Sequence, residues 1–391
     1  MSAARVLVVD DSALMRRLLT EILGSDPSLE VVGTAPDPIK AWTLIQTLRP
    51  DVLTLDVEMP KMDGISFLER LMRAHPMPVV MVSSRTTKGA DTTLRALELG
   101  AVDFVAKPAI DVERGLADLA REIVAKVKAA SSARLRYHKV ASPAGAGPAA
   151  PGPSHAAGPP SRPATPNAAP PSRPHAPPPS RPIGSISASA ASGTIIAIGS
   201  STGGTEALRE VLAPMPANSP GIVVVQHMPE HFTKQFAARL DHYCQMRVKE
   251  AENGDAIVPG QILIAPGSVF HMEVARQGAS SIVRLVDAPP LRHHRPAVDM
   301  LFNSCAKILA AKVIGVILTG MGEDGAQGLL AMHRAGARTI AQDEASCVVF
   351  GMPKAAIQLG AADYVLSLER IPAQMLALAS GGAPQAHAAA R

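Results

Sequence analysis

The stretch Thr194-Ile-Ile-Ala-Ile-Gly-Ser-Ser-Thr-Gly-Gly-Thr205 carries the strongest signal for both fold and chemistry in this chain. Its apolar residues predict a buried strand that runs directly into Gly199-Ser-Ser-Thr-Gly203, which has the Gly-x-Ser-x-Gly spacing of a nucleophile elbow. Glycines on either side allow a sharp turn from strand to helix, which exposes the Ser201 hydroxyl in front of backbone N–H groups. Any tight turn between a strand and a helix also favours small residues. The stretch therefore predicts a serine nucleophile only if the rest of the chain supplies its partners.

The composition limits the classes of protein to which the chain can belong. Its 391 residues exceed one ordinary domain, and a hydrophobic content of 47% is ample for globular folding. Cys244, Cys305 and Cys347 are far apart and outside any Cys-x-x-Cys motif, which indicates reduced thiols. A net charge of only +4, 3% aromatic residues and no visible recognition module argue against nucleic acid as a partner. The sequence shows neither a long apolar run nor a signal-like N-terminus, so we expect a cytoplasmic protein without membrane insertion.

A segment built from Pro, Ala, Gly and Ser divides the chain. Between Lys139 and Ser192 it contains no acidic residue and repeats Ser-Arg-Pro three times. Such a composition buries too little apolar surface to offset its ordering entropy, and its prolines predict a semi-stiff, extended spacer. We therefore expect one domain at residues 1–125, a basic linker at 126–192, a second domain at 193–375 and a disordered tail at 376–391.

Short apolar runs alternate with helical periodicity on both sides of the linker, which predicts two α/β domains. The first is expected to contain a five-stranded parallel sheet. The second is expected to be doubly wound and mainly parallel, with an antiparallel hairpin where strands between Gln261 and Val286 follow each other closely. In such folds, ligands bind beyond the carboxyl ends of the strands. The expected strands are 6–9, 30–33, 52–55, 79–82, 103–106, 195–198, 222–225, 262–264, 282–286, 313–318 and 339–341.

Polar side chains follow four of the five N-terminal strands. Asp10 and Asp11 follow the first strand, Asp56 the third, Ser83 the fourth and Lys107 the fifth. Carboxylates that meet at one sheet edge repel each other unless a cation is present, and Mg²⁺ prefers such oxygen ligands. Each residue alone could be a helix cap or a turn former. The whole set favours a phosphoryl group attached to Asp56, with a cation, a hydroxyl and an ammonium around it.

The segments Val8-Val-Asp-Asp-Ser, Leu55-Asp-Val-Glu-Met-Pro-Lys-Met-Asp-Gly64 and Ala106-Lys-Pro resemble a response-regulator receiver domain. The resemblance covers roughly the first 125 residues and implies a flavodoxin-like fold. It implies that Asp56 accepts phosphate from a chemosensory histidine kinase, and that Asp10 and Asp11, together with Asp56, hold Mg²⁺. It also implies that Lys107 contacts the phosphoryl group, while Ser83 and Phe104 report phosphorylation as switch residues.

The C-terminal half supplies partners for Ser201. A serine nucleophile needs a base and a group that orients the base. His227 comes at the end of the strand that contains Ile222–Val225, and Asp324 lies in the loop Thr319-Gly-Met-Gly-Glu-Asp-Gly325 after another strand. Ser201, His227 and Asp324 can thus meet at one edge of the sheet. Their order differs from that of α/β-hydrolases, but triads are defined by geometry and not by order.

Two other motifs in this half suggest different chemistry. His227-Met-Pro-Glu-His231 fits His-x-x-Glu-His, a zinc pattern that requires both histidines on one helical face. Here His227 closes a strand and Pro229 is the expected helix start, which disfavours zinc. Gly320-Met-Gly-Glu-Asp-Gly325 has dinucleotide-binding spacing, but its acidic residues would oppose a pyrophosphate. Asp324 alone could also be a helix N-cap.

The C-terminal motifs together resemble the protein-glutamate methylesterases of bacterial chemosensory systems. They are Gly199-Ser-Ser-Thr-Gly-Gly-Thr-Glu-Ala-Leu, Val225-Gln-His-Met-Pro, His294-Arg-Pro-Ala-Val-Asp299, Leu318-Thr-Gly-Met-Gly-Glu-Asp-Gly and Phe350-Gly-Met-Pro-Lys. The resemblance implies Ser201 as nucleophile, His227 as base and Asp324 as its orienter, with Thr202 and Met321 beside the oxyanion. It also implies phosphorylation-activated hydrolysis of glutamate γ-methyl esters, and deamidation of glutamines, on methylated chemoreceptors, with no cofactor for the esterase.

Two alternatives remain open from the sequence. The C-terminal domain could bind a partner through a vestigial triad, which methanol release from methylated receptors would exclude. It could instead bind a nucleotide, which equilibrium binding of NAD would test.

Overall fold

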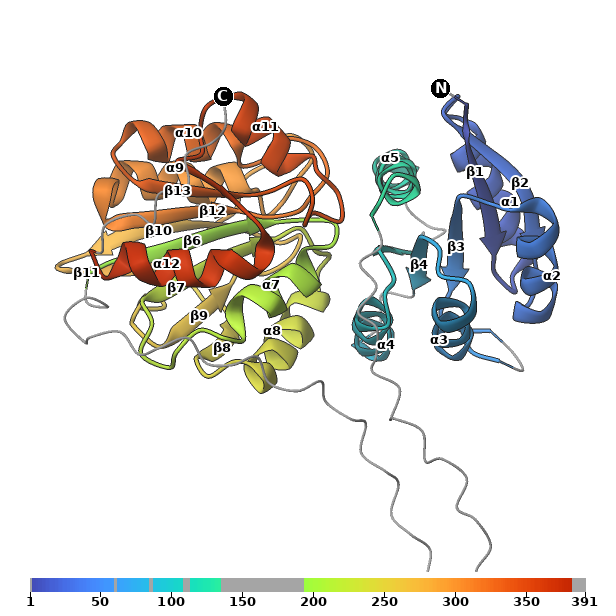
Figure 1. Ribbon diagram of the computed structural model, residues 1–391, viewed down its shortest axis with the longest axis horizontal. Helices are drawn as coiled ribbons and strands as arrows, with labels where there is room; N and C mark the ends of the chain where they lie inside the picture. The colour runs from blue at the N-terminus through green and yellow to red at the C-terminus, as the bar shows by residue number, and fades with distance from the viewer. Residues whose placement is uncertain (1, 60–61, 84–86, 108–112, 135–192, 382–391) are drawn as a thin grey trace, which may run out of the picture. The chain divides into compact units, whose positions relative to one another are not determined.

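The computed structural model describes residues 2–59, 62–83, 87–107, 113–134 and 193–381 (Figure 1). Most of the expected linker and residues 382–391 of the expected tail lie outside this part of the chain. The described residues form an N-terminal and a C-terminal α/β domain, as the sequence predicts. No helix in these ranges has both the length and the apolar content that a membrane span requires.

The N-terminal sheet has five parallel strands in the order β2-β1-β3-β4-β5. Helices α1 and α5 pack on one face through residues such as Leu19 and Ile123, and α2, α3 and α4 cover the other face. The chain order reverses between β1 and β3, so their carboxyl ends form the edge at which ligands bind in such sheets. The elements are β1 (Ala4–Val9), α1 (Ala13–Gly24), β2 (Leu29–Ala35), α2 (Pro38–Leu48), β3 (Val52–Asp56), α3 (Gly64–Ala74), β4 (Val79–Ser83), α4 (Thr87–Glu98), β5 (Asp103–Ala106) and α5 (Glu113–Ser131).

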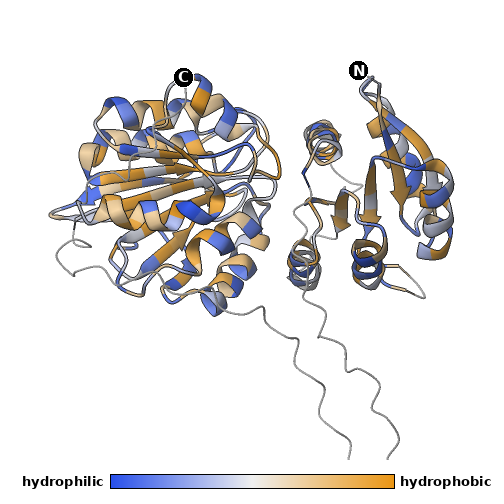
Figure 2. Cartoon of the chain, in the orientation of Figure 1, coloured by the Kyte–Doolittle hydropathy of each residue, from blue (hydrophilic) through white to orange (hydrophobic). Residues whose placement is uncertain are grey.

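The C-terminal sheet has seven parallel strands in the order β14-β13-β12-β6-β7-β9-β8. Helices α9, α10 and α11 cover one face and α7, α8 and α12 the other (Figure 1), and the strands between them are strongly apolar (Figure 2). Strand β6 lies between β12 and β7, so the loops that follow these three strands meet at one edge.

The C-terminal elements begin after the linker. They are β6 (Ile195–Ser200), α7 (Gly204–Leu212), β7 (Gly221–Gln226), α8 (Phe232–Tyr243), β8 (Arg247–Glu250), β9 (Gln261–Ile264), β10 (His271–Gln277), β11 (Ser280–Val286), α9 (Val298–Ile308), η1 (Ala310–Lys312), β12 (Val313–Ile317), α10 (Ala326–Arg334), β13 (Arg338–Gln342), α11 (Met352–Gln358), β14 (Tyr364–Leu366), η2 (Leu368–Arg370) and α12 (Ile371–Ala379).

The expected antiparallel hairpin is present as β10 and β11, which form a two-stranded sheet of their own. Two boundaries differ from the sequence prediction. Helix α5 continues past residue 125 because Val127 and Ala130 extend its buried face. Helix α12 includes residues 376–379, which the sequence analysis assigned to a disordered tail, because Leu376 and Ala379 are buried in the core.

Candidate functional site

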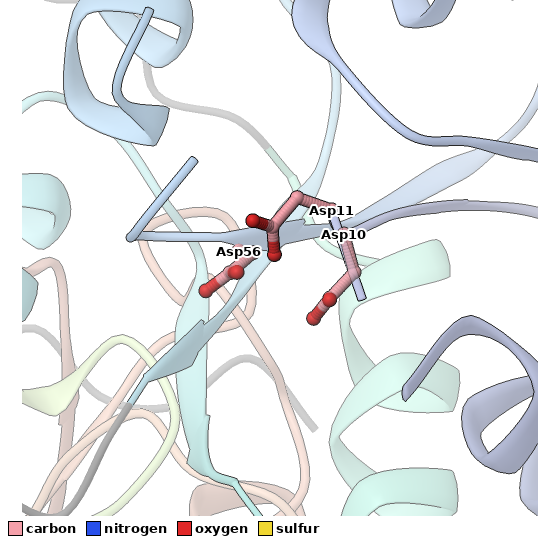
Figure 3. Close-up of side chains that lie close together, drawn as sticks. All are labelled: Asp10, Asp11 and Asp56. Carbon is pink, nitrogen blue, oxygen red and sulfur yellow. The ribbon is translucent and has the colours of Figure 1, made fainter. Parts of the chain in front are cut away.

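Three carboxylates meet at the carboxyl edge of the N-terminal sheet (Figure 3). Asp10 and Asp11 follow β1, and Asp56 is the last residue of β3. One ligand oxygen from each of the three lies within 4.8 Å of the others. The structure thus brings together the three residues that the sequence analysis assigned to a metal, at a spacing that suits a hard divalent cation.

The electrostatics of this cluster favour a bound cation. Lys107 Nζ lies 2.7 Å from Asp56 Oδ2 and 3.7 Å from Asp10 Oδ2. Burial raises the pKa of Asp56 to about 6; the hydrogen bond from Lys107 opposes this effect and the charge of Asp10 adds to it. Burial also raises the pKa of Asp10, whose Oδ2 is buried and accepts no hydrogen bond from the described residues. The residues present therefore fit Mg²⁺, which would satisfy that oxygen and offset the repulsion.

The two expected switch residues lie near this cluster on neighbouring strands. Ser83 ends β4, and its buried hydroxyl accepts a 2.7 Å hydrogen bond from the Thr93 hydroxyl on α4. Phe104 on β5 is buried, and its carbonyl accepts a 2.7 Å hydrogen bond from Lys126 Nζ on α5. The backbone N–H of Lys107 donates to the carbonyl of Ser83 at 2.7 Å. A change at Asp56 can therefore reach α4 and β5 through Lys107 and Ser83.

Ser201 and His227 follow adjacent, in-register strands. Ser200 on β6 pairs with Gln226 on β7, so the next residue on each strand lies at the same edge. The Gln226 carboxamide links the two: its Nε2 donates to the carbonyl of Ser201 at 2.9 Å and to that of His227 at 3.1 Å. Its Oε1 accepts from the Ser200 hydroxyl at 2.7 Å. A Cβ at Gly204 would stand 2.1 Å from this Oε1, so only glycine fits there.

Asp324 reaches the same edge from the loop after β12. Its Oδ2 lies 2.7 Å from His227 Nε2 and accepts the N–H of Val298 at 2.7 Å, while Oδ1 accepts the N–H of Asp299 at 3.0 Å. Burial opposes ionisation of Asp324, but the hydrogen bond and charge of His227 outweigh it and hold the pKa of Asp324 below its usual range. A carboxylate can only accept, so His227 Nε2 carries a proton, and in the neutral imidazole the lone pair is on Nδ1.

His227 Nδ1 is therefore the basic atom of this site. It is buried and has no hydrogen-bond partner among the described residues. Asp324 serves in addition as a cap, but for helix α9 and not for α10, which follows it in the chain. An oriented imidazole with a free lone pair beside a serine elbow is the arrangement that activates a hydroxyl nucleophile.

Thr202 and the loop that contains Met321 both adjoin Ser201. Thr202 follows it directly, and the Thr202 carbonyl accepts a 3.0 Å hydrogen bond from the Thr319 hydroxyl. Met321 follows Gly320, where a Cβ would stand 2.8 Å from that of Ser201, so this loop can approach the serine only because residue 320 is glycine. The structure thus brings the loop that contains Met321 up to Ser201, and Thr202 follows Ser201 in the chain.

The two other motifs do not form the sites that their spacing suggests. Helix α8 begins at Phe232, after His231, so His227 and His231 do not share a helical face. The only polar partner of His231 among the described residues is Glu230, 3.9 Å away, whereas His227 pairs with Asp324. In the Gly-x-Gly-x-x-Gly loop, the Asp324 carboxylate accepts the N–H groups of Val298 and Asp299 and pairs with His227, so the loop carries negative charge where a pyrophosphate would have to bind.

Residues of the N-terminal domain contact this edge. The Thr202 hydroxyl donates a hydrogen bond to Asp103 Oδ2, and the ring of Phe104 stacks on Phe232 at a centroid distance of 4.5 Å. Arg239 on α8 forms ion pairs with two acidic residues of α4, Asp91 and Glu98. Strand β5 therefore contacts Thr202, the residue next to Ser201, while helix α4 contacts helix α8.

The chain was compared with known proteins. The CheB methylesterase family model matches residues 196–375, and the response regulator receiver domain model matches residues 6–119. A protein-glutamate methylesterase/protein-glutamine glutaminase of Bordetella parapertussis is 52% identical over 376 residues, which is 96% of this chain and 97% of that protein. The enzyme of the same name from Salmonella choleraesuis is 51% identical, with 98% of this chain and 99% of the relative covered.

The chain is also similar in part to a solved structure. The CheB methylesterase catalytic domain of Thermotoga maritima is 45% identical and covers 48% of this chain and 99% of its own, with a TM-score of 0.47.

Proposed function

Because the chain belongs to the family of protein-glutamate methylesterases/protein-glutamine glutaminases, we propose that it hydrolyses glutamate γ-methyl esters and deamidates glutamines on chemoreceptors. The observation that carries this proposal is the His227–Asp324 pair at the strand ends beside the Ser201 elbow. Receivers are phosphorylated by histidine kinases, so a chemosensory kinase is the proposed phosphodonor and methylated chemoreceptors are the proposed substrate. We propose that both are met in the cytoplasm.

The reaction follows from the proton positions. Ser201 Oγ attacks the γ-carbonyl carbon, and its proton passes to His227 Nδ1. The oxyanion forms between the backbone N–H groups of Thr202 and Met321. The imidazolium, stabilised by Asp324, returns the proton to the methoxy oxygen, and methanol leaves. Water then attacks the acyl-enzyme with His227 again as base, which yields glutamate and free Ser201.

Glutamine deamidation uses the same steps. The amide nitrogen takes the proton from His227 and leaves as ammonia, so both substrates give one γ-glutamyl ester on Ser201. No metal takes part in this scheme, since every proton transfer is carried by His227.

Phosphorylation regulates this site through the receiver. Asp56 would accept the phosphoryl group while Asp10, Asp11 and Asp56 hold Mg²⁺, which would neutralise charge on the phosphoryl oxygens. Lys107 would move from the carboxylate to the phosphoryl group, releasing its present 2.7 Å contact with Asp56. The contact of Asp103 with Thr202 restrains the residue next to the nucleophile in the unphosphorylated chain. Loss of that contact on phosphorylation would activate hydrolysis.

Methanol release from methylated receptor membranes tests the proposal. The intact chain, treated with Mg²⁺ and a small phosphodonor, should release methanol, and the Ser201→Ala variant should not. A matched control is Ser200→Ala, which removes the neighbouring buried hydroxyl and should retain turnover. Undiminished release by the Ser201→Ala variant would exclude the proposed nucleophile.

A further inference from the structure

His294 lies flat against the proposed catalytic base. Its ring is stacked on that of His227, with centroids 3.9 Å apart and planes 7° from parallel. His227 comes from the end of β7, whereas His294 comes from the loop between β11 and α9. The reaction scheme assigns no step to His294, although the motif His294-Arg-Pro-Ala-Val-Asp299 stands out in the sequence.

A tight turn delivers His294 to this position. The N–H and carbonyl of Leu291 exchange hydrogen bonds with those of His294 at 3.0 and 2.9 Å. The two residues between them, Arg292 and His293, both have left-handed backbone angles, with φ of 49° and 69°. This turn normally uses Asn or Gly, because left-handed angles are unfavourable for larger side chains. Such strain persists only where the surroundings enforce it, and it gathers at functional sites.

The stacked ring supplies a restraint that the hydrogen bond to Asp324 lacks. Nε2 lies nearer than Nδ1 to the axis of rotation about the Cβ–Cγ bond of His227, so a hydrogen bond at Nε2 resists ring rotation less than one at Nδ1 would. Nδ1 lies farther from that axis and has no hydrogen-bond partner among the described residues. Rotation of the ring about this bond would change the direction of Nδ1, and a parallel ring with its centroid 3.9 Å away opposes that rotation.

The charge state of His294 suits this contact. Burial, and secondly the neighbouring His227, lower the pKa of His294 to about 3, so the ring is neutral at neutral pH. A neutral ring adds no positive charge against the imidazolium that forms on His227 during the reaction. Its π-face is instead attractive to a cation.

We propose that His294 is a positioning residue, which holds the plane of the His227 imidazole so that Nδ1 stays directed at Ser201. This inference rests on the proposed function, in which His227 is the general base.

Substitutions at His294 in the intact, phosphorylated chain test this role through kcat and KM for methanol release. An aromatic pair of this kind is worth roughly two- to tenfold in rate if it acts on the transition state. His294→Leu, which fills the space without a flat ring, should lower kcat by about that factor and leave KM within about twofold. His294→Phe restores a flat ring and should recover most of kcat. His293→Asn, in the same turn and tolerant of left-handed angles, is the matched control and should behave as wild type.

A double-mutant cycle separates positioning from a general structural effect. In the His227→Gln background, His294→Leu should cause no further loss of the residual kcat, because both changes act through one imidazole. Equal kcat for the Leu, Phe and wild-type chains, an effect confined to KM, or an undiminished effect in the His227→Gln background would each overturn the positioning role. The proposed function fails separately, if His227→Gln or Ser201→Ala alone leaves turnover intact.

Discussion

Replacing Asp324 by Asn should separate the two tasks of this carboxylate, orienting His227 and capping helix α9. The wild-type carboxylate faces three N–H donors, two at Oδ2 from His227 and Val298 and one at Oδ1 from Asp299. The Asn side chain has one oxygen and one NH₂ group, and the NH₂ group cannot accept from any of them. The orientation with fewer lost bonds places the oxygen at the Oδ2 position and the NH₂ group against Asp299 N–H.

The magnitude follows from that orientation. His227 keeps its tautomer but exchanges a charge-assisted hydrogen bond for a neutral one, which costs about 1.5–3 kcal/mol of imidazolium stabilisation, or roughly 10- to 150-fold in kcat. The wrong tautomer would cost more, on the order of 10⁴-fold, as it does in the serine-protease triad. One buried N–H left without an acceptor lowers the free energy of unfolding by about 1–3 kcal/mol.

Stability should also depend on pH differently in the Asp324→Asn variant. The folded-state pKa of Asp324 is depressed, so its ionisation stabilises the fold above the unfolded pKa of about 3.9 and this contribution disappears as pH falls through the folded value. The difference in unfolding free energy between wild type and variant should therefore shrink below about pH 4. Steady-state methanol release and denaturant titration measure the two effects. A variant that is destabilised but has an unchanged kcat would show that Asp324 is only a helix cap, and would refute the argument.

Three further predictions concern the receiver. Asp56→Asn should retain basal methanol release but lose its stimulation by phosphodonor and Mg²⁺, and persistent stimulation would place phosphorylation elsewhere. The pKa of Asp56 is raised to about 6, so the folded receiver binds a proton at Asp56 more tightly than the unfolded chain does. In the absence of Mg²⁺, the unfolding free energy of the receiver should therefore rise as pH falls from 7 to 5. Fluorescence of Trp42, the single tryptophan, measures this unfolding, and a flat profile in wild type would contradict the raised pKa. A fragment from Gly193 onward should release methanol faster than the intact unphosphorylated chain. Equal activity of the two would reject inhibition by the receiver. The long linker weakens such inhibition because it lowers the effective concentration of the receiver at the catalytic domain.

The regular β-α alternation made most of the fold predictable. Central parallel strands are continuous apolar runs that are recognisable in the sequence, and the polar residues at their ends indicated both candidate sites. Strand β8, Arg247–Glu250, was not predicted because it lies at the sheet edge and has three polar residues of four. Strand β14, Tyr364–Leu366, is an edge strand of three residues, too short for a periodic signal.

The parts of the site that could not be predicted from the sequence depend on contacts between segments that are far apart in the chain. The sequence separates Gln226 from Ser201 by a whole helix, so its bonds to the carbonyls of Ser201 and His227 emerge only from strand register. The stacking of His294 on His227 depends on a turn made by residues whose side chains do not favour it. The adjacent Gln-His pair in Val225-Gln-His-Met-Pro was visible, but nothing in it indicated that the glutamine side chain returns to the serine.

Trapping the acyl-enzyme is the sharpest test of Ser201 as the nucleophile. A receptor peptide that carries a glutamate γ-methyl ester would be mixed with the phosphorylated chain, quenched in acid within one turnover, and digested for mass spectrometry. We expect a γ-glutamyl ester of the peptide on Ser201, formed together with a burst of methanol, and the same adduct from the matching glutamine peptide. Release of methanol in that turnover with no adduct on Ser201, or with the adduct on another residue, would contradict it.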